Sequence, residues 1–197
     1  MSFEPADEQD QADMVRLATG HEAALNDLME RHGERLFHYL IRSLQNEDEA
    51  ADLAQETFVR VYRNRAKFNP AQKFSTWLYA IASNLVKDCY RHRIRHPQVS
   101  LDAQNEQTGS EFGERFADAA ASPSEAMQTS ERAEAVRNAV AALPEELRTP
   151  LILAEYEERS QAEIGEILGC TAKAVETLIY RARKHLREAL GQLLQEV

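Results

Sequence analysis

The residues whose types and spacing best suit a defined chemistry lie near the C-terminal end of the chain. This segment, residues 160–187, reads SQAEIGEILGCTAKAVETLIYRARKHLR. A short amphipathic pattern stops at Gly169, and glycine adopts at little cost the positive φ that ends a helix. A second helical pattern follows and becomes basic in its later turns. The arrangement predicts a helix-turn-helix whose second helix fits the major groove of duplex DNA.

The second helix of this motif offers two kinds of DNA contact. Among its early side chains, Lys173 could reach guanine, Glu176 could accept from cytosine, and Thr177 could touch a thymine methyl group. The later cations are better placed for phosphates. The residues predicted to contact duplex DNA are Thr171, Lys173, Glu176, Thr177, Tyr180, Arg181, Arg183 and Lys184. Arg148 and Arg159 are further candidates for contacts with the DNA backbone. The alternative for the whole motif is an ordinary helical hairpin, and the alternative for each single residue is a solvated helix face.

Charge is segregated along the chain, which explains how a protein of net charge −10 can bind DNA. Residues 60–97 hold nine Lys or Arg and one acid, whereas residues 98–134 hold eight acids and two arginines. Residues 1–13 contain five acids and no base. Because phosphates respond to the local field, a basic block can bind nucleic acid within an acidic chain.

The basic block includes KFSTWLYAIASNLVKDCYRHRIRH, which mixes aromatic, basic and amide side chains. Single-stranded nucleic acid is bound by this combination, with charges on its backbone and aromatic or amide groups on its bases. Phe74 and Trp77 are better explained as core residues, because Trp77 shares a helical stripe with Ile81 and Leu85. The better candidates lie on the polar face, at Asn84, Lys87, Asp88 and Arg91.

Helical patterns dominate the rest of the sequence. Asn46 and Glu49 predict an N-cap with a capping-box partner, and Ser160 and Glu163 predict another. Residues 68–70 interrupt the helices, and Pro123 begins a new one. We therefore expect an all-α protein of two small helical domains with a C-terminal helix-turn-helix. The expected boundaries are 10–97 for the first domain, 98–122 for an acidic flexible linker, and 123–197 for the second domain.

Other functional classes find little support in the sequence. The six histidines form no metal-ligand motif, and no glycine-rich phosphate loop or GxSxG is present, so we expect no enzyme, cofactor, metal or small-molecule substrate. No apolar run approaches the roughly 20 residues of a membrane span, and no secretory signal is recognisable. Cys89 and Cys170 are distant in sequence and are expected to be reduced cytosolic thiols.

Two long runs together resemble one family. They are DLAQETFVRVYRNRAKFNPAQKFSTWLYAIASNLVKD and LPEELRTPLILAEYEERSQAEIGEILGCTAKAVETLIYRARKHLRE, separated by the acidic gap. From about residue 14 onward the chain resembles an extracytoplasmic-function (ECF) sigma factor, a bacterial RNA polymerase initiation subunit that has only sigma regions two and four. The resemblance implies promoter-specific transcription initiation, with stress response as the usual setting.

The resemblance also implies roles for matching residues. The acidic helix would dock on the clamp helices of the polymerase β′ subunit through Glu49, Asp52, Leu53, Gln55, Glu56, Phe58 and Arg60. Melted −10 DNA would be read by Lys67, Phe68, Lys73, Phe74, Asn84, Lys87, Asp88 and Arg91, with Asn84 in the pocket for a flipped base. The helix-turn-helix would read −35 duplex and pack on the β flap.

The resemblance further implies that an anti-sigma factor binds and restrains the chain. It also implies a cytoplasmic location, where such a factor could hold the chain at the inner membrane. Ala51 replaces a common acid of the family, and Glu176 and Leu178 stand where basic residues are frequent, so −35 preference does not carry over. Thr57 is a candidate phosphorylation site, although a solvated or packed threonine fits better. The competing hypotheses are a free-standing helix-turn-helix regulator with an N-terminal sensing or dimerisation domain, and an enzyme fused to a DNA-binding tail.

Overall fold

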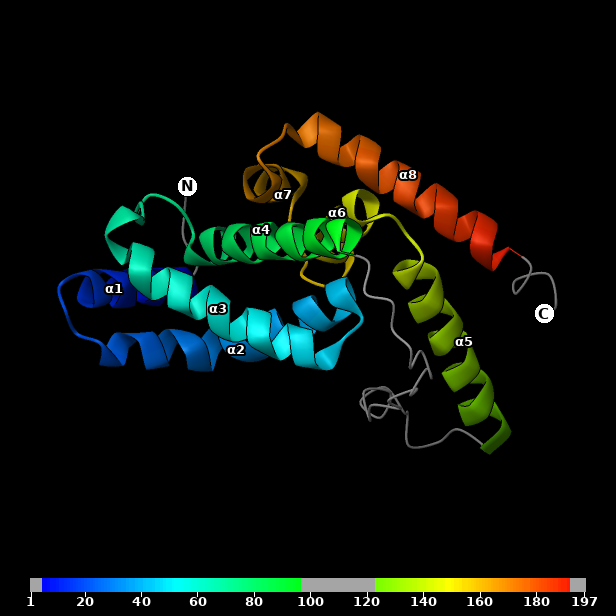
Figure 1. The fold of residues 1–197 in the computed structure, drawn as a ribbon, viewed down its shortest axis with the longest axis horizontal. Coiled ribbons are helices and arrows are strands. Elements are labelled where there is room, and N and C mark those ends of the chain that lie inside the picture. Colours follow the sequence, from blue (N-terminus) through cyan, green and yellow to red (C-terminus); the bar gives the residue numbers. More distant parts are fainter. Residues whose placement is uncertain (1–4, 97–122, 192–197) are drawn as a thin grey trace.

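The computed structural model describes residues 5–96 and 123–191, and these residues are helical without a strand. The N-terminal half contains α1 (Pro5–Ala18), α2 (Ala23–Leu44), α3 (Glu47–Asn64), the short 3-10 helix η1 (Arg65–Lys67) and α4 (Phe74–Arg95). The C-terminal half contains α5 (Pro123–Ala141), α6 (Glu145–Glu155), α7 (Gln161–Leu168) and α8 (Ala172–Leu190) (Figure 1). The all-α prediction is confirmed; the predicted linker, 98–122, lies outside the described residues.

Helices α2, α3 and α4 pack around a shared apolar core, since each buries one face of its helical pattern. Residues buried in this core include Leu28, Leu36, Leu40, Val61, Leu78 and Val86. The buried Tyr39 hydroxyl is satisfied by the Ser83 hydroxyl at 2.8 Å. At the start of α3 the Asn46 side chain accepts a hydrogen bond from the Glu49 backbone N–H at 2.9 Å, so the predicted N-cap is present. The predicted capping-box role of the Glu49 side chain is wrong, because its carboxylate pairs with Arg93 instead.

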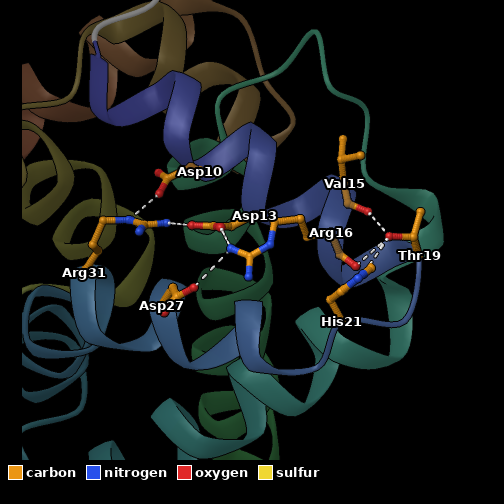
Figure 2. A network of polar contacts seen from close by, with 8 residues as sticks. All are labelled: Asp10, Asp13, Val15, Arg16, Thr19, His21, Asp27 and Arg31. Atoms are coloured by element: carbon orange, nitrogen blue, oxygen red, sulfur yellow. Dashed lines mark hydrogen bonds and ion pairs between the residues drawn. The ribbon is translucent and has the colours of Figure 1, made fainter.

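Helix α1 was not anticipated, because residues 1–13 stood out in the sequence only by their five acids. Asp10 and Asp13 instead turn inward and are only 2% and 3% exposed. Arg31 of α2 donates from Nε to Asp10 Oδ1 at 2.9 Å and from Nη2 to Asp13 Oδ2 at 2.5 Å. Figure 2 shows this network, in which Arg16 also pairs with Asp13. The buried ion pairs fasten α1 to α2 beside the apolar contacts of Met14 and Leu17.

Replacing Arg31 by methionine should destabilise the protein by about 3 kcal/mol, because two buried carboxylates lose their shared cation. Urea unfolding measures the change. Arg16→Met is the matched control and should cost less than about 1 kcal/mol, since the Arg16 side chain is 50% exposed. Equal losses in the two variants would show that the Arg31 network has no special part in holding α1.

Helices α7 and α8 form the predicted helix-turn-helix. The capping box is present, with the Ser160 side chain accepting from the Glu163 N–H and the Glu163 carboxylate accepting from the Ser160 N–H. Gly169 ends α7 with a φ of 68°, as expected. A constraint that the sequence did not indicate is Gly165, where an added Cβ would lie 2.7 Å from the Cys170 carbonyl oxygen. The turn therefore closes tightly over a residue without a side chain.

Gly165→Ala should destabilise the helix-turn-helix by about 2 kcal/mol, since the new methyl group meets rigid backbone. Gly33→Ala is the control within α2, where an added Cβ meets nothing within 4 Å. That substitution should stabilise the chain by up to about 1 kcal/mol through helix propensity. Thermal unfolding followed by circular dichroism compares the two, and changes of the same sign would refute the proposed close approach.

The two halves of the described structure pack against each other. α7 lies against α4, and α6 lies against α2 and α4 (Figure 1). A single cluster of buried apolar residues runs through both halves, from Leu17 of α1 to Ile179 of α8. α8 extends along the outside with α5 and α6 as neighbours. The contact between halves places the helix-turn-helix beside α4, the helix with the predicted single-strand face.

Candidate nucleic-acid and protein interfaces

The first candidate surface is the outward face of α3. Asp52 and Gln55 are exposed on it, and Glu56 accepts from Arg60 Nε at 2.9 Å. Val59, which was not among the predicted docking residues, lies on the same side and is 39% exposed. An acidic face with a central apolar side chain suits a basic or amphipathic protein partner.

Other predicted docking residues of α3 have internal partners. Phe58 is buried in the core, so its assignment as a docking contact is wrong and its part is to hold α3 in place. Leu53 packs partly against the same core. The Glu49 carboxylate forms an ion pair with Arg93 of α4. Burial, together with the nearby Glu49, raises the pKa of the Cys89 thiol. Thr57 is fully buried and donates to the Leu53 carbonyl, so of the two alternatives to a phosphorylation site it is the packed threonine that the structure shows.

The second candidate surface is the polar face of α4. Asn84, Lys87, Asp88 and Arg91 are all exposed, and their spacing of three and four residues places them along one side of the helix. Arg91 lies 3.6 Å from Asp88, an exposed pair of little energetic consequence. The face therefore presents an amide and two cations to solvent at successive turns, as the sequence predicted.

The loop before α4 supplies the remaining predicted −10 residues. Lys67 is exposed, and Phe68 is half-buried with its ring 5.3 Å from that of Trp77. Phe74 is completely buried, so its prediction as a DNA contact is wrong; its ring instead packs against those of Phe68, Trp77 and His32. These aromatic rings pack beneath the loop before α4, on its core side, and support its conformation. Lys73 has carboxylate neighbours from α1 and α7.

The third candidate surface is the start of α8. Thr171 is the N-cap, and its hydroxyl accepts from the Ala174 N–H at 3.2 Å, so it orients the helix. Lys173 donates to Glu176 Oε2 at 2.8 Å on the exposed side. Thr177 is exposed nearby, and Tyr180 is 68% exposed. These side chains project together from the outer side of the helix-turn-helix, where a groove of duplex DNA can reach them.

The cations later in α8 differ in their surroundings. Arg181 is exposed, and Lys184 lies 3.8 Å from Glu188. Arg183 donates from Nη2 to Glu155 of α6 at 2.6 Å, which ties α8 to α6. Arg148, suggested as a backbone contact, is buried and donates to the carbonyls of Ser43 and Leu143. In this arrangement Arg148 joins the two halves and cannot touch DNA.

Within residues 5–96 and 123–191 no helix is both long and apolar enough to span a bilayer. The same part of the chain brings together no group of three or more potential metal ligands.

Comparisons with known proteins point to one family. Residues 28–96 match the family model described as Sigma-70 region 2, and residues 133–186 match the one described as Sigma-70, region 4. The ECF RNA polymerase sigma factor SigW of Bacillus subtilis is 36% identical over 88% of this chain and 92% of its own length. RNA polymerase sigma-H factor of Pseudomonas aeruginosa is 34% identical over 96% of this chain and 97% of its own.

Solved structures give the same fold. CnrH, solved in complex with the cytosolic domain of CnrY, matches with a TM-score of 0.67 and 26% identity, covering 93% of this chain and 98% of CnrH. The sigma factor RpoE, solved with the anti-sigma factor NepR from Bartonella quintana, matches with a TM-score of 0.64 and 21% identity, covering 84% and 96%. With both region models matched in order and relatives similar over nearly their whole length, this chain belongs to the ECF RNA polymerase sigma factors of the sigma-70 family.

Proposed function

We propose that the chain binds core RNA polymerase through the exposed face of α3 and directs initiation by holding two promoter elements at once. The observation that carries this proposal is the separation of three exposed surfaces on one short chain. They are an acidic α3 face around Asp52, a basic α4 face around Asn84, and the projecting start of α8. A protein that only binds duplex DNA has no need of the first two surfaces.

At the −10 element, α4 supplies both charge and base recognition. Lys87 and Arg91 hold backbone phosphates, and Asn84 pairs with the edge of an unstacked base. Lys67, Phe68 and Lys73 belong to the loop that closes the base pocket. Promoter opening then uses binding energy alone, because capture of a flipped base offsets the few kcal/mol that unstacking costs.

At the −35 element, α8 enters the major groove of duplex DNA. Lys173, Glu176, Thr177 and Tyr180 face base edges, whereas Arg181 and Lys184 lie nearer the phosphates. The Lys173–Glu176 ion pair presents a donor and an acceptor side by side, so substitution of either residue changes what the other can reach. In this proposal the C-terminal half also packs on the β flap of the polymerase, and an anti-sigma factor restrains the chain.

The competing proposal is a free-standing helix-turn-helix regulator, which would bind its operator tightly without polymerase. Run-off transcription on a library of random promoters separates the two. Purified core polymerase should select a restricted set of promoters with shared −35 and −10 sequences only when the chain is present. Tight sequence-specific binding of library duplexes by the chain alone, with no transcript from core enzyme, would favour the regulator.

A further inference from the structure

A buried carboxylate lies at the contact between the two halves of the chain. Glu157, in the connection between α6 and α7, is only 4% exposed. The Tyr79 hydroxyl of α4 donates to Glu157 Oε2 at 2.5 Å. Two cations of α2 face the same carboxylate, with Arg35 Nε at 3.6 Å and Arg42 Nη1 at 3.7 Å. One acid of the C-terminal half is thus held by three side chains of the N-terminal half.

Further polar contacts flank Glu157. Arg159 donates to the Ser75 hydroxyl at 3.0 Å, and its guanidinium lies 5.0 Å from the centre of the Tyr79 ring. Arg148 donates to the Ser43 carbonyl at 2.8 Å. Burying charge carries a desolvation penalty that offsets much of the attraction, so such contacts add less net stability than an apolar interface of equal size. Apolar residues of both halves also belong to one buried cluster, so the polar contacts set the geometry of an interface that is only partly apolar and can still separate.

The contact between halves also covers the start of the proposed −10 surface. Lys73 Nζ lies 3.1 Å from Glu163 of α7 and 3.6 Å from Asp7 of α1. A hollow of about 390 Å³ beside it is lined by Asn69, Gln72 and Thr76 on one side and by Glu163 and Glu166 on the other. The hydrogen bond to Glu163 raises the pKa of the Lys73 ammonium. Two α7 carboxylates therefore face the loop where the proposed function places a DNA strand.

We propose that the contacts of Glu157 act as a latch that holds the chain in a closed state. In this state α7 covers the loop before α4, and the Glu163 carboxylate pairs with the Lys73 ammonium. Release of Glu157 from Tyr79, Arg35 and Arg42 frees α7 to move away with the C-terminal half. The Lys73 ammonium then keeps only Asp7 of α1 as a carboxylate neighbour and can bind an anionic ligand. The latch itself concerns the free chain alone, and only its consequence for melted DNA rests on the proposed function.

The test uses the full chain without polymerase or DNA. Glu157→Gln removes the buried charge, and Arg35→Glu places a repulsive charge opposite Glu157 from a side chain that is 56% exposed and not required by the core. Glu158→Gln is the control, because Glu158 is the exposed neighbour of the latch residue. Small-angle X-ray scattering should show a larger radius of gyration for both latch variants than for the wild type. The control should have the radius of gyration of the closed wild type. Circular dichroism confirms that helix content is kept.

Lysine acylation gives a second readout at the covered site. The free chain is treated briefly with an amine-reactive acetyl ester, and modification of Lys73 is measured by mass spectrometry relative to exposed Lys67. The ratio should rise severalfold in Glu157→Gln and Arg35→Glu and stay at the wild-type value in Glu158→Gln. Unchanged scattering and an unchanged ratio in both folded latch variants would overturn the proposal, as would an already extended wild type. Neither outcome depends on whether the chain binds polymerase.

Discussion

Asp52→Arg should weaken binding to core RNA polymerase by about a hundredfold while leaving the fold unchanged. Asp52 is exposed on α3, so the substitution removes no internal contact of the described structure. It replaces attraction to a basic partner surface by repulsion, and reversing a close interfacial charge pair typically costs about 3 kcal/mol. That free energy corresponds to roughly a hundredfold in Kd. Fluorescence anisotropy of the labelled chain titrated with core enzyme measures the change.

The control for Asp52→Arg is Glu30→Arg, an equal change of charge at an exposed position of α2. A general electrostatic effect would weaken both variants alike, whereas docking on α3 affects only the first. Wild-type affinity of Asp52→Arg for core enzyme would remove the assignment of α3 as the docking face. Because the long-range part of such an interaction is screened by salt, both titrations belong at the same ionic strength.

Asn84→Ala should reduce open-complex formation about tenfold to a hundredfold and leave core binding within twofold of the wild type. Asn84 is exposed on α4, and its amide can donate to and accept from the edge of one base. Loss of a captured base removes about 1–3 kcal/mol from the melted complex. Permanganate reactivity of unpaired thymines, on a promoter taken from the library selection, reports the fraction of open complex.

Asn26→Ala serves as the control for Asn84→Ala, because it removes an exposed amide from α2 without touching the α4 face. A premelted template adds a second comparison: the Asn84→Ala defect should be smaller there, since the duplex no longer has to be opened. An equal loss of core affinity and open complex in Asn84→Ala would place Asn84 in polymerase docking. Normal melting by this variant would refute its assignment to the −10 base.

Features set by local chemistry were predictable from the sequence. Asn46, Ser160 and Gly169 occupy the helix ends that their side chains or backbone freedom predict. The exposed stripe from Asn84 to Arg91 follows from helical periodicity alone. Phe58 and Phe74 show the limit of transferring roles by resemblance, because both matched positions lie inside the core. For Phe74 the apolar stripe had already indicated burial, and that physical indication was the better guide.

Features that depend on distant partners were not predictable. Asp10 and Asp13 are buried because they pair with other side chains, above all Arg31 and His32 of the next helix, whereas an acidic terminus alone suggests solvent exposure. Glu157 stands among other acids in AEYEERSQ, and nothing local distinguishes it from Glu155 or Glu158. Its burial arises from Tyr79 and two arginines more than 70 residues earlier in the chain. Arg148 was misassigned for the same reason.

The central claim is that one chain binds two partners at the same time through separate surfaces. The acidic face of α3 binds polymerase, and the basic face of α4 binds melted promoter DNA. Co-elution of the purified chain with core RNA polymerase on a size-exclusion column, followed by binding of forked or bubbled promoter templates, tests it most directly. The chain should elute with core enzyme at one copy per polymerase, and the complex should bind bubbled templates more tightly than the matching duplex. A chain that elutes alone and leaves the preference of core enzyme for bubbled DNA unchanged would contradict the claim.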